Sequence, residues 1–279
     1  MYTDYHLHSE FSDDSRTPME QQIETAIGRG LQEICFTDHV DYGIKPDWTD
    51  PQPITMRGGN YLANVNYPEY FAKLQRMQRM YGESITIRKG LEFGVQRHTI
   101  PRYQKLAETW REELDFILLS IHQVEDKEFW TQDFQRGRTQ EEYNRRYYQE
   151  LKTVVEEFDE YDVVAHVDLI SRYDKAGKYP FAKIEDILRK ILTTVIAHGK
   201  GIELNTSSWR YGLDDLTPSR DILRLYRSLG GRILTLGSDA HTPRDVGNHG
   251  KEARQILRGE LGFTEFCTYE KHRPIFHPL

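Results

Sequence analysis

The sequence predicts an α/β protein built as a parallel barrel of seven strands. Short apolar runs alternate with helical patterns along the chain, and polar motifs close most of these runs. The carboxyl ends of parallel strands are where barrels and open α/β sheets place active sites. A doubly wound open sheet would show the same alternation, but side chains from almost every strand converge more easily around a closed ring. Seven strands indicate an incomplete or distorted barrel.

The β-like runs lie at residues 2–8, 33–38, 85–92, 115–121, 161–166, 201–205 and 233–238. A first helix is expected with Thr17 as N-cap, Pro18 at its first position, Glu20 completing a capping box and Gly30 just past its end. Further helical patterns cover about 68–81, 102–113, 139–158, 184–199, 218–229 and 244–258. The pair Thr217 and Pro218 is expected to open the helix at 218–229.

The longest connection, residues 40–66, contains Asp41, Tyr42, Lys45, Asp47 and Trp48. Loops of this length often form lids or substrate walls. We therefore expect this loop to border the active site.

Composition narrows the class of protein and its partners. The 279 residues include 37 Lys and Arg against 44 Asp and Glu, a formal charge of -7, which opposes binding to nucleic acid or to an anionic membrane. Only two cysteines occur, and no run of eighteen apolar residues or signal peptide is evident, which favours the cytoplasm. Without repeats or a Gly/Ser-rich linker, residues 1–279 are expected to form one domain that acts on a small molecule without an obligate protein partner.

Six motifs that close apolar runs carry the chemistry: YHLH, FTDH, GLEF, LSIH, VAHVD and GSDAH. On a strand, His6 and His8 point to the same face and can bind one metal side by side. A mixture of imidazole and carboxylate suits Zn, Mn or Fe. One HxH motif alone is weak evidence for a metal site. The six motifs are spread along the whole chain, so only folding can bring their side chains together.

The ordered set HLHSEFS, TDH, GLE, SIH, AHVD and SDAH, spanning residues 6–241, resembles the motifs of the PHP (polymerase and histidinol phosphatase) metallohydrolases. The runs at 11–15, 166–174 and 205–210, together with the overall length, resemble the histidinol-phosphatase branch. This resemblance implies a distorted seven-stranded, TIM-like PHP barrel that holds two to three divalent transition-metal ions (Zn, Mn or Fe) at the carboxyl ends of its strands.

The resemblance also assigns residues to three metal sites. The expected ligands are His6, His8, Glu92 and Asp239 for the first metal, Glu92, His122 and His166 for the second, and Asp14, His39 and His241 for the third. Some relatives have histidine in place of Asp14, so Asp13 remains an alternative. Glu92, Asp239 and His241 are the expected catalytic residues; a carboxylate such as Glu92 can bridge two cations that activate a water.

Arg172 and Arg210 follow predicted strand ends and are the candidates for binding substrate phosphate, with Lys45 and Arg97 as weaker ones. Asp38 and Asp168 either orient histidine ligands or protonate the leaving group, and the sequence does not separate these roles.

The resemblance favours a phosphatase that hydrolyses L-histidinol phosphate to L-histidinol and phosphate in histidine biosynthesis. One alternative is a PHP phosphoesterase for another small phosphomonoester or a nucleotide. Others are a nucleic-acid accessory domain, which the acidic charge opposes, and a metal-binding regulator without catalysis, which the full set of candidate ligands opposes.

Overall fold

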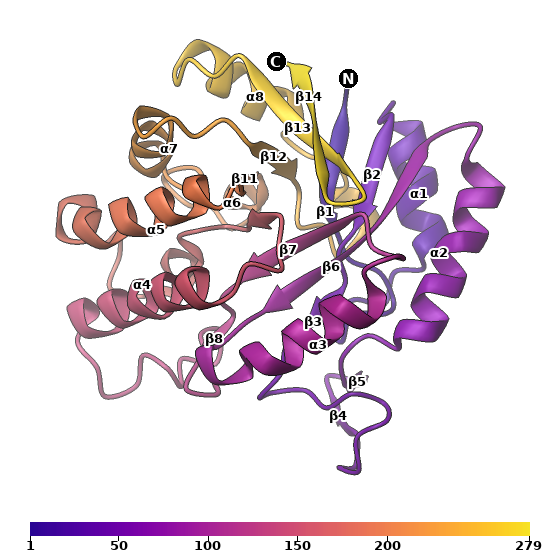
Figure 1. The fold of residues 1–279 in the computed structure, drawn as a ribbon, viewed down its shortest axis with the longest axis horizontal. Coiled ribbons are helices and arrows are strands. Elements are labelled where there is room, and N and C mark those ends of the chain that lie inside the picture. The colour runs from indigo at the N-terminus through magenta and orange to yellow at the C-terminus, as the bar shows by residue number, and fades with distance from the viewer.

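A nearly closed barrel of seven parallel strands forms the centre of the protein (Figure 1), in a computed structural model that describes residues 1–279. In spatial order the strands are β1 (Thr3–Leu7), β2 (Glu33–Phe36), β6 (Thr86–Gly94), β7 (Phe116–Ser120), β10 (Val163–Val164), β11 (Gly201–Asn205) and β12 (Leu234–Gly237). All seven expected strands are confirmed, and the spatial order follows the sequence order.

The barrel closes where the first and last strands meet. Leu7 pairs with Ala240 in a parallel bridge just beyond β12, and the His8 backbone N–H donates to the Ala240 carbonyl at 3.0 Å. The buried Asp4 carboxylate strengthens this seam by accepting hydrogen bonds from the backbone N–H and hydroxyl of Ser238 and from the Gly247 N–H. The sequence therefore joins its two distant ends into one ring.

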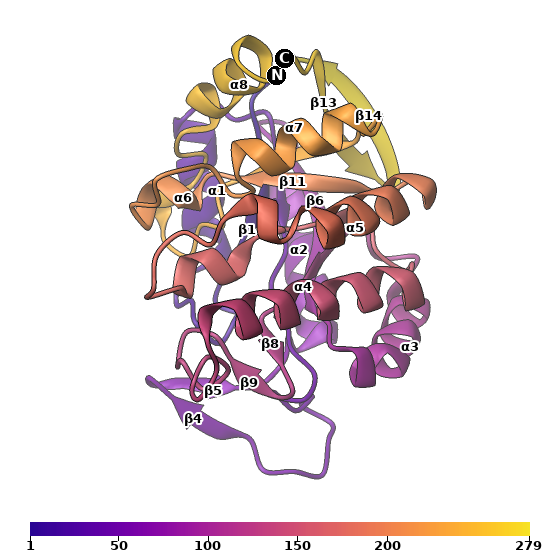
Figure 2. The ribbon, with the colours of Figure 1, turned by 90° about the vertical axis from the view of Figure 1, so that its left-hand side faces the viewer.

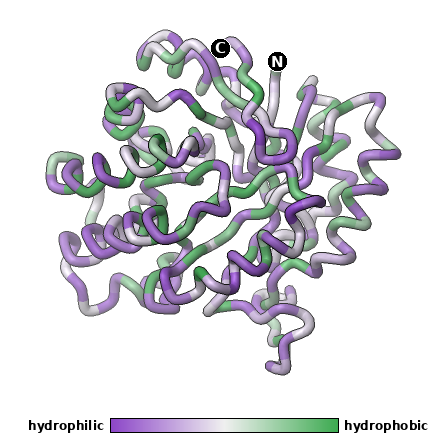
Figure 3. Tube along the Cα trace, in the orientation of Figure 1, coloured by the Kyte–Doolittle hydropathy of each residue, from purple (hydrophilic) through white to green (hydrophobic).

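Helices cover the outside of the ring and bury their apolar faces against it. They are α1 (Met19–Gly28), α2 (Tyr67–Tyr81), α3 (Ile100–Trp110), α4 (Gln140–Glu157), α5 (Glu185–Ala197), α6 (Ser207–Arg210), α7 (Arg220–Ser228) and α8 (Gly250–Gly259). In Figure 3 the central strands are mainly hydrophobic, whereas the helices carry many hydrophilic positions. No helix combines the length and the apolar character needed to cross a membrane.

Three expected helix starts were wrong. Thr17 does not cap α1, because its hydroxyl donates to the His241 carbonyl while Glu20 pairs with Lys73. Helix α7 begins after Ser219 rather than at Pro218. Helix α8 begins at Gly250 rather than near residue 244, because Gly247 and His249 have positive φ angles that interrupt the helix.

Short strand β3 (His39–Val40) pairs with β6, and two hairpins without a clear sequence signal extend the carboxyl end of the barrel. They are β4 (Thr55–Arg57) with β5 (Asn60–Leu62), and β8 (Gln123–Val124) with β9 (Lys127–Glu128). A third hairpin, β13 (Glu265–Glu270) with β14 (Arg273–Pro278), lies at the opposite end (Figure 2). This hairpin covers the amino end of the barrel, where the Tyr269 N–H donates to the Tyr5 hydroxyl at 2.8 Å.

We expect Asp4→Ala to lower the free energy of unfolding by about 2–4 kcal/mol, because it removes the acceptor of the Ser238 N–H, the Ser238 hydroxyl and the Gly247 N–H at the seam. Urea unfolding of the metal-free protein measures this change. Asp159→Ala, at an exposed position, is the control and should stay within about 0.5 kcal/mol of the wild type. Equal stability of the two variants would contradict the role given to Asp4.

Candidate active site

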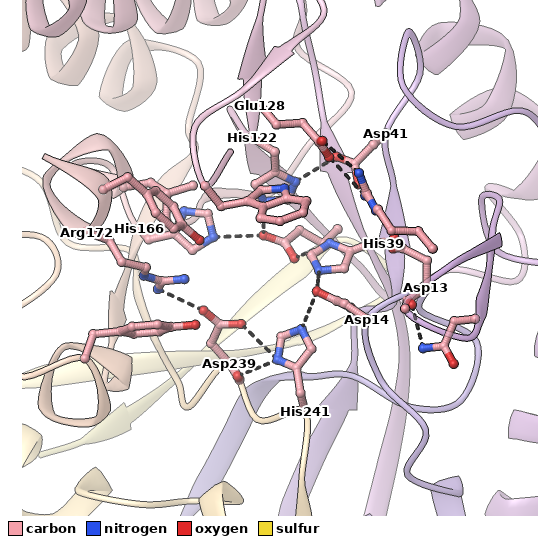
Figure 4. Close-up of a pocket in the computed structure, with 18 of the residues that line it drawn as sticks. Asp13, Asp14, His39, Asp41, His122, Glu128, His166, Arg172, Asp239 and His241 are labelled. Carbon is pink, nitrogen blue, oxygen red and sulfur yellow. Dashed lines mark hydrogen bonds and ion pairs between the residues drawn. The ribbon is translucent and has the colours of Figure 1, made fainter. Parts of the chain in front are cut away.

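A cavity of about 710 Å³ opens at the carboxyl end of the barrel, where the strand-end motifs converge (Figure 4). Its lining is predominantly polar and includes imidazoles, carboxylates and guanidinium groups. The barrel therefore gathers these side chains at one place, although they are spread over more than two hundred residues of sequence.

Glu92, at the end of β6, lies at the centre of the cluster and is fully buried. Its carboxylate oxygens lie 3.1 Å from His6 Nε2, 3.0 Å from His39 Nδ1, 3.1 Å from His122 Nε2 and 2.9 Å from His166 Nε2. One carboxylate thus faces imidazoles from four other segments, which is the geometry a bridging ligand requires.

Asp239 and Asp14 complete the two ends of the cluster. Asp239 Oδ1 lies 3.5 Å from His8 Nε2 and 3.8 Å from His6 Nε2. Asp14 Oδ2 lies 3.5 Å from His39 Nε2 and 3.1 Å from His241 Nε2. All nine residues expected from the sequence are therefore brought together.

Asp13 is directed elsewhere and lies apart from the imidazoles of His39 and His241 (Figure 4). Its carboxylate pairs with Lys45 and lies 3.3 Å from Arg57 Nη2. Between the two neighbouring aspartates, the geometry favours Asp14 as the ligand.

The hydrogen bonds of His8 leave a lone pair directed into the cluster. The Ser12 hydroxyl donates to Asp38, so His8 Nδ1 must donate to Ser12 Oγ, and His8 Nε2 keeps its lone pair. That buried Nε2 atom has no hydrogen-bond partner. A neutral imidazole with an inward lone pair is what a transition metal needs, so the residues fit a divalent metal centre.

Triads of ligand atoms within 4.8 Å of one another include Glu92, His122 and His166, as expected for the second metal, and His6, His8 and Glu92 from the first. Other triads mix residues from different expected sites, among them His8, His39 and His241. The side chains are thus close enough for a multinuclear centre, while the division of ligands among the metals stays a prediction.

Two carboxylates behind the cluster fix its histidines, and the sequence reasoning did not assign them this role. Glu203 Oε1 accepts a hydrogen bond from His6 Nδ1 at 2.7 Å, and Asp41 Oδ1 accepts one from His122 Nδ1 at 2.7 Å. A charged residue in the middle of the apolar strand at 201–205 was the available signal for Glu203. Such partners fix the tautomer and orientation of a metal-binding imidazole.

Two glycines leave room for this outer layer. A Cβ atom on Gly94 would overlap the Asp41 carboxylate, and one on Gly237 would overlap the Glu203 carboxylate. Gly94 ends the strand that carries Glu92, and Gly237 ends the strand that precedes Asp239. The close approach of the carboxylates to the backbone explains why these positions lack a side chain.

Asp38 and Asp168 lie outside the cavity lining, which opposes a role in protonating the leaving group. Asp38 accepts hydrogen bonds from Ser9 and Ser12, and through Ser12 it orients His8. Asp168 instead accepts from the backbone N–H of Ser219 at 2.8 Å, so it holds a neighbouring loop rather than a histidine ring.

The backbone is strained at two candidate ligands. His166 has a φ of 22° and Asp239 a φ of 57°, in the left-handed region that residues with side chains seldom adopt. Both follow directly on short strands, where the turn directs their side chains into the cluster. Strain of this kind is concentrated at functional sites.

The charges within the cluster compensate for its burial. Burial alone would raise the pKa of the Glu92 carboxyl, but the positive charge that His6, His122 and His39 carry when they are protonated in the metal-free protein holds that pKa well below its usual value. The neighbouring imidazoles of His241 and His39 likewise lower the pKa of Asp14, whose carboxylate is half-exposed. The carboxylates therefore stay ionised, as metal ligands must.

The two predicted arginines flank Asp239. Arg172 Nη2 donates to Asp239 Oδ2 at 3.0 Å and to Ser207 Oγ at 2.6 Å, and Arg210 Nη2 donates to the Asp239 carbonyl at 2.8 Å. The Tyr211 ring lies 4.3 Å from the Arg172 guanidinium carbon and 5.2 Å from that of Arg210. Arg97, the weaker candidate, lies outside the cavity and pairs with Glu157 on the surface.

The expectation for the 40–66 loop was right for Lys45 and wrong for Asp47 and Trp48. Lys45 lines the cavity, as does Arg57 on β4. Asp47 instead accepts hydrogen bonds from Tyr42 and Tyr67, and the Trp48 indole donates to the Asn64 carbonyl. These two side chains are engaged within the loop and do not reach the cavity.

The wall that the sequence reasoning missed comes from β9 and the residues just after it. Glu128 Oε2 lies 2.7 Å from Arg57 Nη1, and the Arg57 guanidinium carbon lies 5.0 Å from the centre of the half-exposed Trp130 ring. Glu128 and Trp130 both line the cavity. Their short connection carries no local motif, so only the folded structure places them there.

Comparison with known proteins identifies the family. A model of the PHP domain matches residues 4–207. Histidinol-phosphatase from Lactococcus lactis subsp. lactis is 31% identical over 274 residues, covering 95% of this chain and 93% of its own length. A probable histidinol-phosphatase from Thermotoga maritima is 27% identical over 256 residues, covering 91% of each chain.

A solved structure extends this likeness to three dimensions. The crystal structure of histidinol phosphate phosphatase from Lactococcus lactis, in complex with zinc, L-histidinol and phosphate, superposes with a TM-score of 0.84 at 29% identity and covers 98% of both chains. A putative histidinol phosphatase from Listeria monocytogenes shares the fold, with a TM-score of 0.71 at 18% identity, covering 89% of this chain and 99% of its own. The motifs, the barrel and these matches agree, and the chain belongs to the PHP domain family.

Proposed function

We propose that this protein is a metal-dependent phosphatase that hydrolyses L-histidinol phosphate to L-histidinol and phosphate, a reaction of histidine biosynthesis. The observation that carries the proposal is the cluster around Glu92, in which imidazoles and carboxylates for a multinuclear metal centre lie beside two arginines. The relative from Lactococcus lactis, similar over nearly the whole chain, supports the choice of substrate.

The metal centre that we propose contains two to three divalent ions, with zinc in the related crystal structure as the first candidate. The proposed ligands are His6, His8, Glu92 and Asp239, then Glu92, His122 and His166, then Asp14, His39 and His241. Such ions, when bound, neutralise phosphate oxygens and lower the pKa of a water that attacks phosphorus. Glu92 and Asp239 hold this centre in place, and His241 lies at its outer edge beside Asp14.

Arg172 and Arg210 are proposed to bind oxygens of the substrate phosphate. Burial would lower the pKa of Arg172, but Asp239 raises it above its usual value, so the guanidinium stays charged. The Tyr211 ring supports both guanidinium groups. Charged donors held in this way stabilise negative charge that shifts during P–O cleavage.

The alcohol product carries an ammonium group and an imidazole, and the opposite wall of the cavity suits them. Three carboxylates, Asp13, Asp41 and Glu128, lie on this wall beside three cations, Lys45, Arg57 and Arg16. We propose that Glu128 pairs with the ammonium group and that Trp130, 52% exposed, packs against the imidazole.

We expect the purified protein to release phosphate from L-histidinol phosphate and to lose this activity on exhaustive chelation, with recovery when Zn²⁺ or Mn²⁺ is returned. Glu92→Gln should be among the most damaging substitutions, because it weakens two metal sites at once. Elemental analysis and a phosphate-release assay measure both effects. Full activity in chelated, metal-free protein would refute the proposed function.

Arg172→Ala and Arg210→Ala should each lower kcat/KM for L-histidinol phosphate by roughly ten- to a thousandfold, with a loss in kcat as well as in binding. The reason is that their contacts with phosphate strengthen in the transition state. Metal content, measured on the same samples, serves as the control, since Arg172 also contacts Asp239. Wild-type kinetics in both variants would assign phosphate binding to other residues.

Glu128→Gln and Trp130→Ala should reduce the preference for L-histidinol phosphate over p-nitrophenyl phosphate by about tenfold, because only the natural alcohol uses the charged contact. Asp47→Ala and Trp48→Ala are matched controls, since neither side chain lines the cavity. Equal losses on both substrates, or the same effect in the control variants, would count against this wall as the specificity site.

A further inference from the structure

A second cavity, of about 200 Å³, lies behind the segments that carry the two phosphate-site arginines. Asn144 and Tyr148 of α4, the segment 171–184 and the segment 212–222 contribute to its lining. One side is apolar, with Tyr148, Phe181, Leu216 and Ile222. None of its lining residues belongs to the lining of the active-site cavity.

The polar side of this cavity contains buried groups without partners. Asp168 is only 5% exposed, and while Oδ2 accepts from the Ser219 N–H, no protein group hydrogen-bonds to Oδ1. The Tyr179 hydroxyl, also buried, has no partner either. Buried polar groups are nearly always hydrogen-bonded, so two unpaired ones in the wall of a single cavity indicate a site for a ligand that supplies the missing contacts.

The charge of the wall defines the class of ligand. Four carboxylates, Asp168, Asp174, Asp214 and Asp215, face one cation, Lys178. Asp174 is occupied by Tyr143 and Asn144, and Asp215 by Arg220 and Lys178. Asp168 therefore offers the free acceptor at the buried end, and the apolar side suits a flat ring.

We propose that this cavity is a binding site for a small organic cation, a primary amine that carries one ring. The ammonium group donates to Asp168 Oδ1, and the ring packs between Tyr148, Phe181 and Ile222. The Tyr179 hydroxyl can donate a hydrogen bond to an oxygen or nitrogen substituent on this ring, or accept one from it.

The site is placed where it can act on the phosphate arginines, an effect that rests on the proposed function. Ser171 and Asp174 line the second cavity, while Arg172 and Tyr173 between them line the active site. Arg210 and Tyr211 line the active site, and Gly212 and Leu213 directly after them line the second cavity. A ligand here contacts both segments from behind, so its binding is coupled to that of phosphate, and the coupling is reciprocal.

The test is calorimetric titration of the metal-loaded protein with benzylamine, with benzoate as the control of opposite charge. Benzylamine should bind saturably with a Kd of about 1 mM or tighter, and benzoate should not bind here. Asp168→Asn, which keeps the shape of the side chain but removes the carboxylate, should raise the Kd of benzylamine at least about tenfold. Phe181→Trp, which narrows the cavity and leaves Asp168 in place, should weaken benzylamine binding as well. It tests the site independently if Asp168→Asn does not fold.

Glu128→Gln separates this site from the active site, because it removes the proposed ammonium contact there and should leave the component of benzylamine binding that depends on Asp168 unchanged. Loss of binding in Glu128→Gln but not in Asp168→Asn would overturn the proposal, as would a crystal structure at millimolar benzylamine with only water in the second cavity. Saturating benzylamine should also change the Kd of inorganic phosphate at least about threefold. An unchanged phosphate Kd would overturn the coupling, and since no turnover is measured, this outcome is distinct from failure of the proposed function.

Discussion

The structure depends on one interaction, the burial of the Glu92 carboxylate among imidazoles. A buried carboxylate is strongly destabilising unless positive charge compensates it, and ring nitrogens of His6, His39, His122 and His166 lie within 3.1 Å of Glu92, where a proton or a bound metal ion supplies that charge. Each imidazole comes from a different strand end, so these contacts form only when those strands are assembled. Asp239, just after β12, contacts His6 and His8 across the seam, so the complete cluster also requires the barrel to close between β1 and β12.

The outer carboxylates extend this dependence one layer further. Glu203 fixes His6 and Asp41 fixes His122, and each occupies space that only a glycine, at 237 or 94, leaves open. A single imidazole is thus held by its strand, by a carboxylate behind it and by the backbone beside that carboxylate. This arrangement holds the inward nitrogen in a fixed direction before any metal is present, which lowers the cost of assembling the centre.

Much of the fold and of the metal cluster could be predicted because both follow from periodic, local signals. Strand-end motifs such as YHLH and GSDAH fix the register of a ligand relative to the barrel, and all nine candidate ligands lie together. Prediction failed where distant contacts override local preference. Thr17 has the pattern of a cap, yet it binds the His241 carbonyl across the barrel seam, whereas a true capping box forms at Thr139 and Glu142, where no such competitor exists.

The two walls of the active-site cavity also differ in how well the sequence predicts them, because one depends on local signals and the other on a distant contact. The wall that carries Arg172 and Arg210 is built from barrel strands and the segments that follow them, so rules for strand ends locate these two arginines. The other side consists of the β4–β5 hairpin and of β9, which are joined by the contact between Arg57 and Glu128 across 71 residues of sequence. Nothing local to either hairpin specifies that pairing. The candidate metal ligands are therefore readable from the sequence of the barrel, whereas the opposite wall of the cavity is held by an ion pair that only the folded structure reveals.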